Sequence, residues 1–132
     1  MNSVKSKFHN PDPSAGQGAR KEVNVNKVYS MLGLAMKAGK VASGEFATDK
    51  SVKSGKAWLV IVSEDASDNT RKMFSNMCEF YEVPRYFFGT KEELGHAIGK
   101  AMRSSLAITD ENFAKSIRKQ LEQSVKSEGE EE

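Results

Sequence analysis

The sequence has few of the residues from which covalent frameworks, metal sites and membrane spans are built. It contains one cysteine and two histidines. A single cysteine excludes an intramolecular disulfide and suits a reducing compartment. No apolar run approaches the roughly 18 residues of a membrane-spanning helix, and the polar N-terminus has no signal-peptide pattern. We therefore expect a soluble, cytoplasmic protein without a membrane partner.

The usual combinations of catalytic residues are also missing. The sequence has no Walker loop, no GxGxxG motif and no Cys–His cluster. His9 lies in a polar segment, His96 stands alone on a predicted helix, and Cys78 lies on an apolar helical stripe that favours a core position. The acidic pair at 64–65 follows an apolar strand, and we interpret it as capping the helix that begins near Ser67. The sequence therefore predicts no enzyme activity, no cofactor and no metal.

The length of 132 residues is enough for one domain. Residues 1–22 are rich in Ser, Asn, Lys, Pro and Gly and have almost no apolar periodicity, which predicts a disordered N-terminal arm. Residues 127–132 are predicted to form an acidic, disordered tail. A single folded domain is therefore expected at 23–126.

Helical and strand patterns alternate along this domain. Val28, Met31, Leu32 and Ala35 have the spacing of a buried helical face. The run Trp58–Val62 is apolar without alternation, which is typical of a central strand covered on both faces. The other predicted elements are a strand at Val41–Ser43, a helix at Phe46–Ser54, a helix that begins near Ser67 and carries an apolar stripe from Met73 to Tyr81, a strand at Tyr86–Phe88, a helix opened by a Thr90–Glu93 capping box, a strand at Leu106–Ile108 and a last helix capped by Asp110. This order predicts a layered α/β fold with helices on both faces of the sheet.

Charge is distributed unevenly. Residues 26–58 contain six lysines and two acidic residues, whereas residues 64–111 contain six basic and nine acidic residues. A local basic segment is compatible with a polyanionic partner such as RNA. Lysines on a helix can also serve only to keep that face solvated, so charge alone leaves both interpretations open.

Gly44 opens the lysine-rich helix of this basic segment. The first N–H groups of a helix have no intrahelical acceptor, so such an end suits an anion. Lys40 precedes Gly44, and Lys50 and Lys53 follow it on the helix. This arrangement fits a phosphate backbone, and it also fits an ordinary solvated helix that follows a tight turn.

A second basic segment, residues 99–105 (GKAMRSS), links a predicted helix to the last strand. Lys100 and Arg103 flank Met102 there. Small residues allow a backbone to approach a ligand closely, and an apolar tip can contact an unstacked base. The alternative is an ordinary helix–strand connection in which Met102 packs into the core.

The run GEFATDKSVKSGKAWLVIVSED followed by ELGHAIGKAMRSSLAI resembles the kink-turn RNA-binding superfamily. That superfamily includes the large-subunit ribosomal proteins "L-seven-Ae" and "L-thirty-e". The segments LGLAMKAGKVASGE and EDASDNTRKM resemble its small bacterial, YlxQ-type members. The resemblance extends over roughly residues 26–121.

The resemblance implies a three-layer α/β/α sandwich with a four-stranded mixed sheet. It also implies a non-catalytic, monomeric protein that binds ribosomal or kink-turn-containing RNA, with the ribosome as a candidate partner. The family's RNA surface consists of the second helix's N-terminal part, the loop after the central strand and the loop before the last strand. The candidate RNA-binding residues are Lys40, Gly44, Glu45, Phe46, Lys50, Lys53, Glu64, Asp65, Lys100, Met102, Arg103 and Ser104.

One departure from the family pattern leaves alternatives open. Archaeal relatives carry an Asn-Glu pair that reads sheared G·A pairs, and alignment on Lys50 and Gly55 places Phe46 and Ala47 at those positions. Phe46 is then expected either to stack on a base or to fix the helix to the core. A protein-interaction module that kept the fold and lost kink-turn reading is the main alternative function. An enzyme, or its substrate-binding part, is a third, which the short chain disfavours.

Overall fold

The computed structural model describes residues 16–131, with side chains described from Val25 to Gln123. Helices and strands alternate along this range. Their bounds are α1 (Gly16–Lys37), β1 (Val41–Ser43), α2 (Glu45–Lys53), β2 (Leu59–Val62), α3 (Asp68–Tyr81), β3 (Arg85–Phe87), α4 (Lys91–Ala97), β4 (Ser105–Ile108) and α5 (Glu111–Glu131). The predicted order of elements is confirmed.

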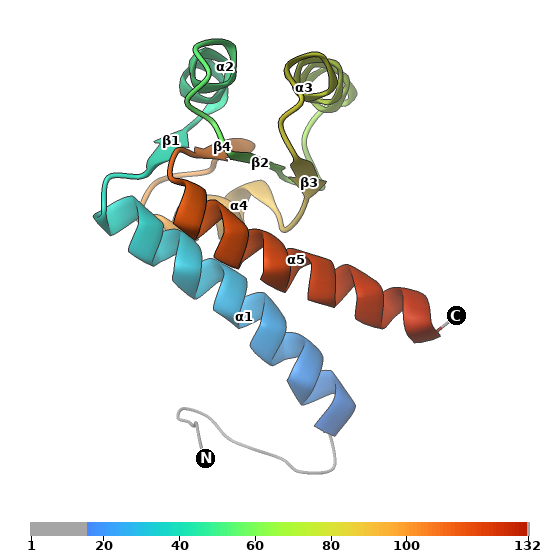
Figure 1. Cartoon of the computed structure of the whole chain (residues 1–132). Helices are drawn as coiled ribbons and strands as arrows, with labels where there is room; N and C mark the ends of the chain where they lie inside the picture. Colours follow the sequence, from blue (N-terminus) through green and yellow to red (C-terminus); the bar gives the residue numbers. More distant parts are fainter. Residues whose placement is uncertain (1–15, 132) are drawn as a thin grey trace.

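The four strands form one mixed sheet in the order β1-β4-β2-β3. β4 pairs antiparallel with β1 and β2, whereas β2 and β3 are parallel. Helices α2 and α3 lie side by side over one face, and α1, α4 and α5 cover the other (Figure 1). The fold is therefore the expected three-layer α/β/α sandwich with a four-stranded mixed sheet.

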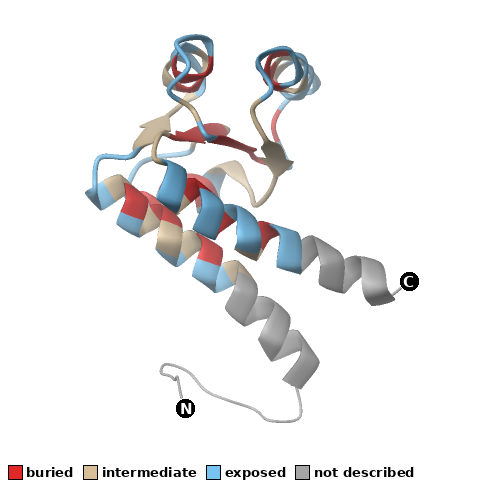
Figure 2. Ribbon diagram, viewed as in Figure 1, coloured by how far each residue is buried: buried red, intermediate tan, exposed pale blue. Residues whose placement is uncertain are grey.

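The apolar run of β2 explains its central position. All four of its residues are buried, and they alternate between the two hydrophobic cores. Leu59 and Ile61 face the core under α1 and α5, whereas Val60 and Val62 face the core under α3. A strand buried on both faces needs apolar residues at every position, which is why alternation is absent. In Figure 2 the inner strands are coloured as buried.

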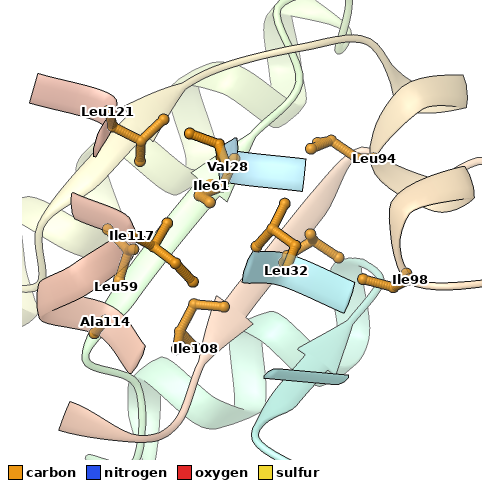
Figure 3. Packing of buried hydrophobic residues seen from close by; sticks show 11 residues of the cluster. Val28, Leu32, Leu59, Ile61, Leu94, Ile98, Ile108, Ala114, Ile117 and Leu121 are labelled. Atoms are coloured by element: carbon orange, nitrogen blue, oxygen red, sulfur yellow. The ribbon is translucent and has the colours of Figure 1, made fainter. Parts of the chain in front are cut away.

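The larger core lies between the sheet and the helices α1, α4 and α5. Val28 and Leu32 from α1 pack there with Leu94 from α4 and Ile117 from α5 (Figure 3). Each of these side chains is fully buried, and burying such a side chain stabilises the fold by about 1.5–3 kcal/mol. The same packing fixes α4, and with it the connection from α4 to β4.

The smaller core lies between the sheet and the pair α2 and α3. It contains Val52, Phe74, Met77 and Cys78. Burial raises the pKa of the Cys78 thiol to about 11, with Arg85 opposing the shift. The thiol is therefore protonated and unreactive at neutral pH, which agrees with the predicted core position of this residue.

The first and last helices extend beyond the predicted domain bounds of 23–126. Residues 16–22 form the start of α1, and residues 127–131 belong to α5. Residues 16–22 include Ala, Arg, Lys and Glu, and residues 127–131 include three Glu, all of which are strong helix formers, and each segment continues a helix that is packed further along. Apolar periodicity does not reveal such polar extensions of a helix. Residues 1–15, which include His9, and residue 132 lie outside the described residues.

Glu82, just after α3, has the backbone conformation that glycine normally adopts at a helix end. Its φ and ψ of 60° and 45° lie in the left-handed region, and the Val83 N–H donates to the Cys78 carbonyl at 2.9 Å. We expect Glu82→Gly to raise the free energy of unfolding by about 1 kcal/mol. Urea unfolding would measure it. Glu79→Gly, inside the same helix, is the control and should lower it by about 1 kcal/mol; a loss in both variants would contradict this reading.

Candidate nucleic-acid interface

The N-terminus of α2 begins at Gly44, whose backbone conformation excludes other residues. Its φ of 95° and ψ of 164° lie in a region that is almost restricted to glycine. The Gly44 N–H donates to the Ser105 carbonyl at 2.9 Å, and the Gly44 carbonyl accepts from the Thr48 N–H at 2.9 Å. The start of α2 is therefore fixed against the start of β4. No side chain caps this helix end, so its first N–H groups are available to an anion.

The first turn of α2 presents an aromatic side chain to solvent. Phe46 is 80 % exposed, so the possibility that it fixes the helix to the core is wrong. Thr48, Ser51 and Val52 provide the buried face of the helix instead. Phe46 and Lys50 are four residues apart and therefore share one face. Glu45 and Lys50 are also exposed, and this face of α2 is free to contact a ligand.

The connection between α4 and β4, residues 98–104, lies beside this helix end. Met102 is 62 % exposed, so the alternative in which it packs into the core is wrong. The Arg103 Nε donates to Ser43 Oγ at 3.4 Å, and its Nη1 donates to the Met102 carbonyl at 2.9 Å. A Cβ on Gly44 would lie 3.9 Å from the Arg103 Cδ and Nε. The start of α2 and the 98–104 connection, which the sequence presented as two separate basic segments, thus form one surface, called the candidate surface below.

Gly95 holds the 98–104 connection in place, a role that the sequence pattern ELGHAIGK did not reveal. It is buried in α4, and its carbonyl accepts from the Lys100 N–H at 2.8 Å. A Cβ at this position would lie 1.8 Å from the Ala101 carbonyl oxygen. The connection can therefore approach α4 only because the residue is glycine. Only the packing partner shows this requirement, because glycine inside a helix carries no distinctive local signal.

The acidic pair Glu64 and Asp65 lies at the same end of the sheet. The Ser63 N–H donates to the Ser104 carbonyl at 2.9 Å, and the Glu64 N–H donates to the Gly89 carbonyl at 2.7 Å. These bonds join the end of β2 to both neighbouring loops. Glu64 and Asp65 are exposed and border the candidate surface.

The predicted capping role of this pair is wrong. Ser67 caps α3 by accepting the Thr70 N–H, whereas the Asp65 Oδ1 accepts the Lys91 N–H at the start of α4 at 2.9 Å. The helix that Asp65 assists is remote in sequence, so a local pattern could not identify it. Desolvation raises the pKa of Asp65, but the Lys91 N–H and further hydrogen bonds outweigh it and lower the pKa below its usual value. The carboxylate therefore stays charged at neutral pH.

Two of the candidate lysines lie apart from this surface. Lys40 precedes β1, and its carbonyl accepts the Thr109 N–H beyond the far end of β4. It is separated from Gly44 by the length of β1, roughly 10 Å. Lys53 lies in the last turn of α2 and forms an ion pair with Asp49 at 3.2 Å. Lys100 is exposed and Ser104 is half-buried, and both lie in the 98–104 connection.

No group of three or more His, Cys, Asp or Glu residues in the described part of the chain could hold a metal ion. His96 is exposed on α4. The nearby Tyr29 hydroxyl donates to Glu93 at 2.8 Å, and burial together with this bond raises its pKa. Among the described helices, none has the length and apolar character to cross a membrane.

The three-layer sandwich, with the candidate surface at one end of its sheet, defines a class of small α/β proteins. A sequence model described as "Ribosomal protein L7Ae/L30e/S12e/Gadd45 family" matches residues 26–118. The chain belongs to this family. The matched segment begins in α1 and ends in α5, so it includes both sides of the sandwich and every element of the candidate surface.

Individual relatives are similar to this chain over most of their length. An "RNA-binding protein YlxQ" of Bacillus subtilis is 40 % identical over 89 residues, which is 67 % of this chain and 89 % of the relative. A protein of the same name from Enterococcus faecium is 38 % identical over 76 % of this chain and 97 % of its own. The "Large ribosomal subunit protein eL8" of Thermoplasma volcanium is 30 % identical over 74 % of this chain and 84 % of its own.

Solved structures agree with the fold. A protein of unknown function from Bacillus halodurans has a TM-score of 0.71 and 34 % identity, covering 73 % of this chain and 97 % of its own. A "15.5kD RNA binding protein" of Giardia lamblia has a TM-score of 0.64 and 22 % identity, covering 89 % of this chain and 93 % of its own. The second of these supports the fold alone.

Proposed function

We propose that this protein is a non-catalytic, cytoplasmic RNA-binding protein that acts as a monomer on structured RNA, either ribosomal or kink-turn-like. The observation that carries the proposal is the juxtaposition of the uncapped α2 N-terminus with Arg103 and with two exposed apolar side chains, Phe46 and Met102. The names of the YlxQ and ribosomal relatives support the same class of partner. Ribosome association follows from that class.

The proposed mechanism divides phosphate contacts from base contacts. The free N–H groups of α2, together with Lys50, Lys100 and Arg103, hold phosphates and position the RNA. Phe46 and Met102 provide apolar surface on which an unpaired, extruded base rests. Exposed cations and exposed apolar groups both occur in the segments that form this surface, and this combination favours single-stranded or kinked segments over a regular duplex.

This protein must recognise a kink-turn RNA differently from relatives that use an Asn-Glu pair. Phe46 and Ala47 have no side-chain group that can hydrogen-bond a guanine edge. The exposed carboxylate of Glu45 lies one residue earlier on the helix. We propose that the backbone N–H groups of the α2 N-terminus and the ring of Phe46 recognise the shape of the kink, so that discrimination between RNAs comes from geometry.

A salt titration with a kink-turn RNA tests this function. The control RNA has its sheared G·A pairs replaced by Watson–Crick pairs. We expect tighter binding to the kinked RNA, and affinity for both should fall linearly on a logarithmic salt axis because phosphate contacts release counterions. Equal binding to both RNAs would leave RNA binding in place and remove the kink-turn specificity. Absence of binding at low salt would refute the proposed function.

The protein-interaction alternative has its own supporting observation. Trp58, Phe80 and Tyr81 are exposed at the opposite end of the molecule, where α2 and α3 end. Exposed aromatic side chains are typical of protein interfaces. A pull-down from cell extract separates the alternatives: a partner retained after ribonuclease treatment favours the protein interface, and loss of every partner favours RNA.

A further inference from the structure

Two arginines converge on one aromatic ring at the outer edge of the sheet. The Arg85 guanidinium carbon lies 4.2 Å from the centre of the Phe87 ring, and that of Arg71 lies 5.0 Å from it. Arg85 and Phe87 belong to β3, and Arg71 belongs to the first half of α3. The ring holds the two guanidinium groups close together, since each gains by stacking on it.

Their positive charges are not balanced by nearby carboxylates. Within residues 25–123, no carboxylate forms an ion pair with Arg71 or Arg85. The Arg85 Nε is buried and has no hydrogen-bond acceptor in the described part of the chain. A buried donor without an acceptor is unfavourable, and two adjacent like charges repel each other. An anion that accepts from N–H groups of both guanidinium groups would offset the repulsion between them.

The position of this arginine pair points to an anion that is part of a longer chain. β3 is an edge strand in the order β1-β4-β2-β3, so this side of the sheet is open. Phe87 pairs with Val62 of β2. The residue after Val62 is Ser63, and its N–H donates to the Ser104 carbonyl in the 98–104 connection. The ring therefore lies at the same end of the sheet as the candidate surface. Three strand spacings, roughly 14 Å, separate β3 from β1 at the other edge.

We propose that Arg71 and Arg85 form a second phosphate site, for the backbone of an RNA strand that leaves the candidate surface and crosses the edge of β3. The proposal rests on the proposed RNA-binding function. The guanidinium groups donate to one or two phosphodiester oxygens, and a guanidinium matches the planar geometry of two such oxygens. The Phe87 ring is occupied by the arginines, so the contact reads no base. This site sets how much flanking RNA the protein holds, not which sequence it selects.

The test compares two RNAs that share one kinked core. The first ends at the core. The second carries a single-stranded oligouridine extension and is made in two versions, one with the extension at the 5′ end and one with it at the 3′ end. We expect the native protein to bind one extended RNA more tightly than the core RNA. The double variant Arg71→Gln/Arg85→Gln should lose this gain, with an affinity about tenfold lower for the extended RNA and a logarithmic salt slope smaller by about 2. Its affinity for the core RNA should be unchanged.

Three controls make the result decisive. Lys72→Gln removes one charge from the neighbouring residue of α3, which is exposed and is not one of the two cations that stack on Phe87 in the described part of the chain. This variant should change neither affinity by more than about twofold. Arg85→Lys keeps the positive charge but lacks the paired N–H donors of a guanidinium. It should therefore lose part of the affinity gained from the RNA extension. Thermal melting verifies that each variant folds.

The outcomes separate this inference from the proposed function. Extended and core RNAs that bind equally well to the native protein would overturn the second phosphate site alone. An Arg71→Gln/Arg85→Gln variant that matches Lys72→Gln would overturn it as well. If neither RNA binds the native protein, the proposed function itself fails.

Discussion

Gly95→Ala should lower the free energy of unfolding by about 2–3 kcal/mol and weaken RNA binding at least about tenfold. The added Cβ would lie 1.8 Å from the Ala101 carbonyl oxygen and 2.6 Å from its carbon, where distances below 3.0 Å are not tolerated. Because these are backbone atoms, the 98–104 connection must move away from α4. Lys100, Met102 and Arg103 then lose their positions relative to Gly44. Urea unfolding and RNA titration of the same preparation measure the two effects.

Gly99→Ala provides the matched control in the same connection. Gly99 has a φ of 74°, and a Cβ there would meet no atom within 4 Å. The substitution therefore brings the cost of the left-handed conformation, about 1 kcal/mol, without displacing a neighbour. RNA affinity should stay within about twofold of the native value. Equal losses of affinity in the two variants would show that the position of the connection is not what the RNA recognises.

Local sequence signals predicted the fold well where one residue's environment is decided by its neighbours in the chain. The capping box between Thr90 and Glu93 is present with both of its hydrogen bonds. The Asp110 carboxylate accepts the Phe113 N–H at 2.9 Å at the start of α5, as a local helix cap does. The unbroken apolar run of β2 predicted its central position, because a central strand is covered on both faces and needs apolar residues at every position.

Errors of one or two residues arose where tertiary pairing decides an element's bounds. β3 consists of Arg85–Phe87, whereas the sequence predicted Tyr86–Phe88. Its register follows from pairing with β2, with Arg85 opposite Val60. Trp58 lies outside β2 and is 49 % exposed, although its apolar character placed it in the strand. Pairing partners are remote in sequence, so composition could not fix these limits.

The sequence predicted the segments that form the candidate surface but not the residues that hold those segments in place. Gly44 and the 98–104 connection were each recognised as weak motifs, and the structure brings them together through Arg103. Gly95 and the bond from Lys91 to Asp65 support that geometry. Both depend on contacts between segments far apart in the chain, for which a single sequence contains no signal. Lys40 was grouped with the surface because of its nearness in sequence, but a full strand separates it from Gly44.

Lys50→Ala and Arg103→Ala should each weaken RNA binding about fivefold, and the double variant by about twentyfold to thirtyfold. Each side chain is assigned a phosphate contact, so each loss should reduce the logarithmic salt slope by about 1. The loss should be similar for RNAs of different sequence, because phosphate contacts carry no base information. Fluorescence titrations over a range of salt concentrations measure both quantities.

Lys56→Ala is the matched control for Lys50→Ala because it removes the same charge from an exposed position beyond the other end of α2. The nine residues of α2 place it roughly 13 Å from the N-terminus. A nonspecific effect of net charge would make the two variants equal. A phosphate contact on the α2 face that carries Phe46 and Lys50 would make Lys50→Ala bind RNA more weakly and reduce its salt slope, while Lys56→Ala stays close to the native protein. Unchanged affinity in both Lys50→Ala and Arg103→Ala would place the RNA on a different face of the sandwich, and the exposed ring of Phe46 would then have no ligand to explain it.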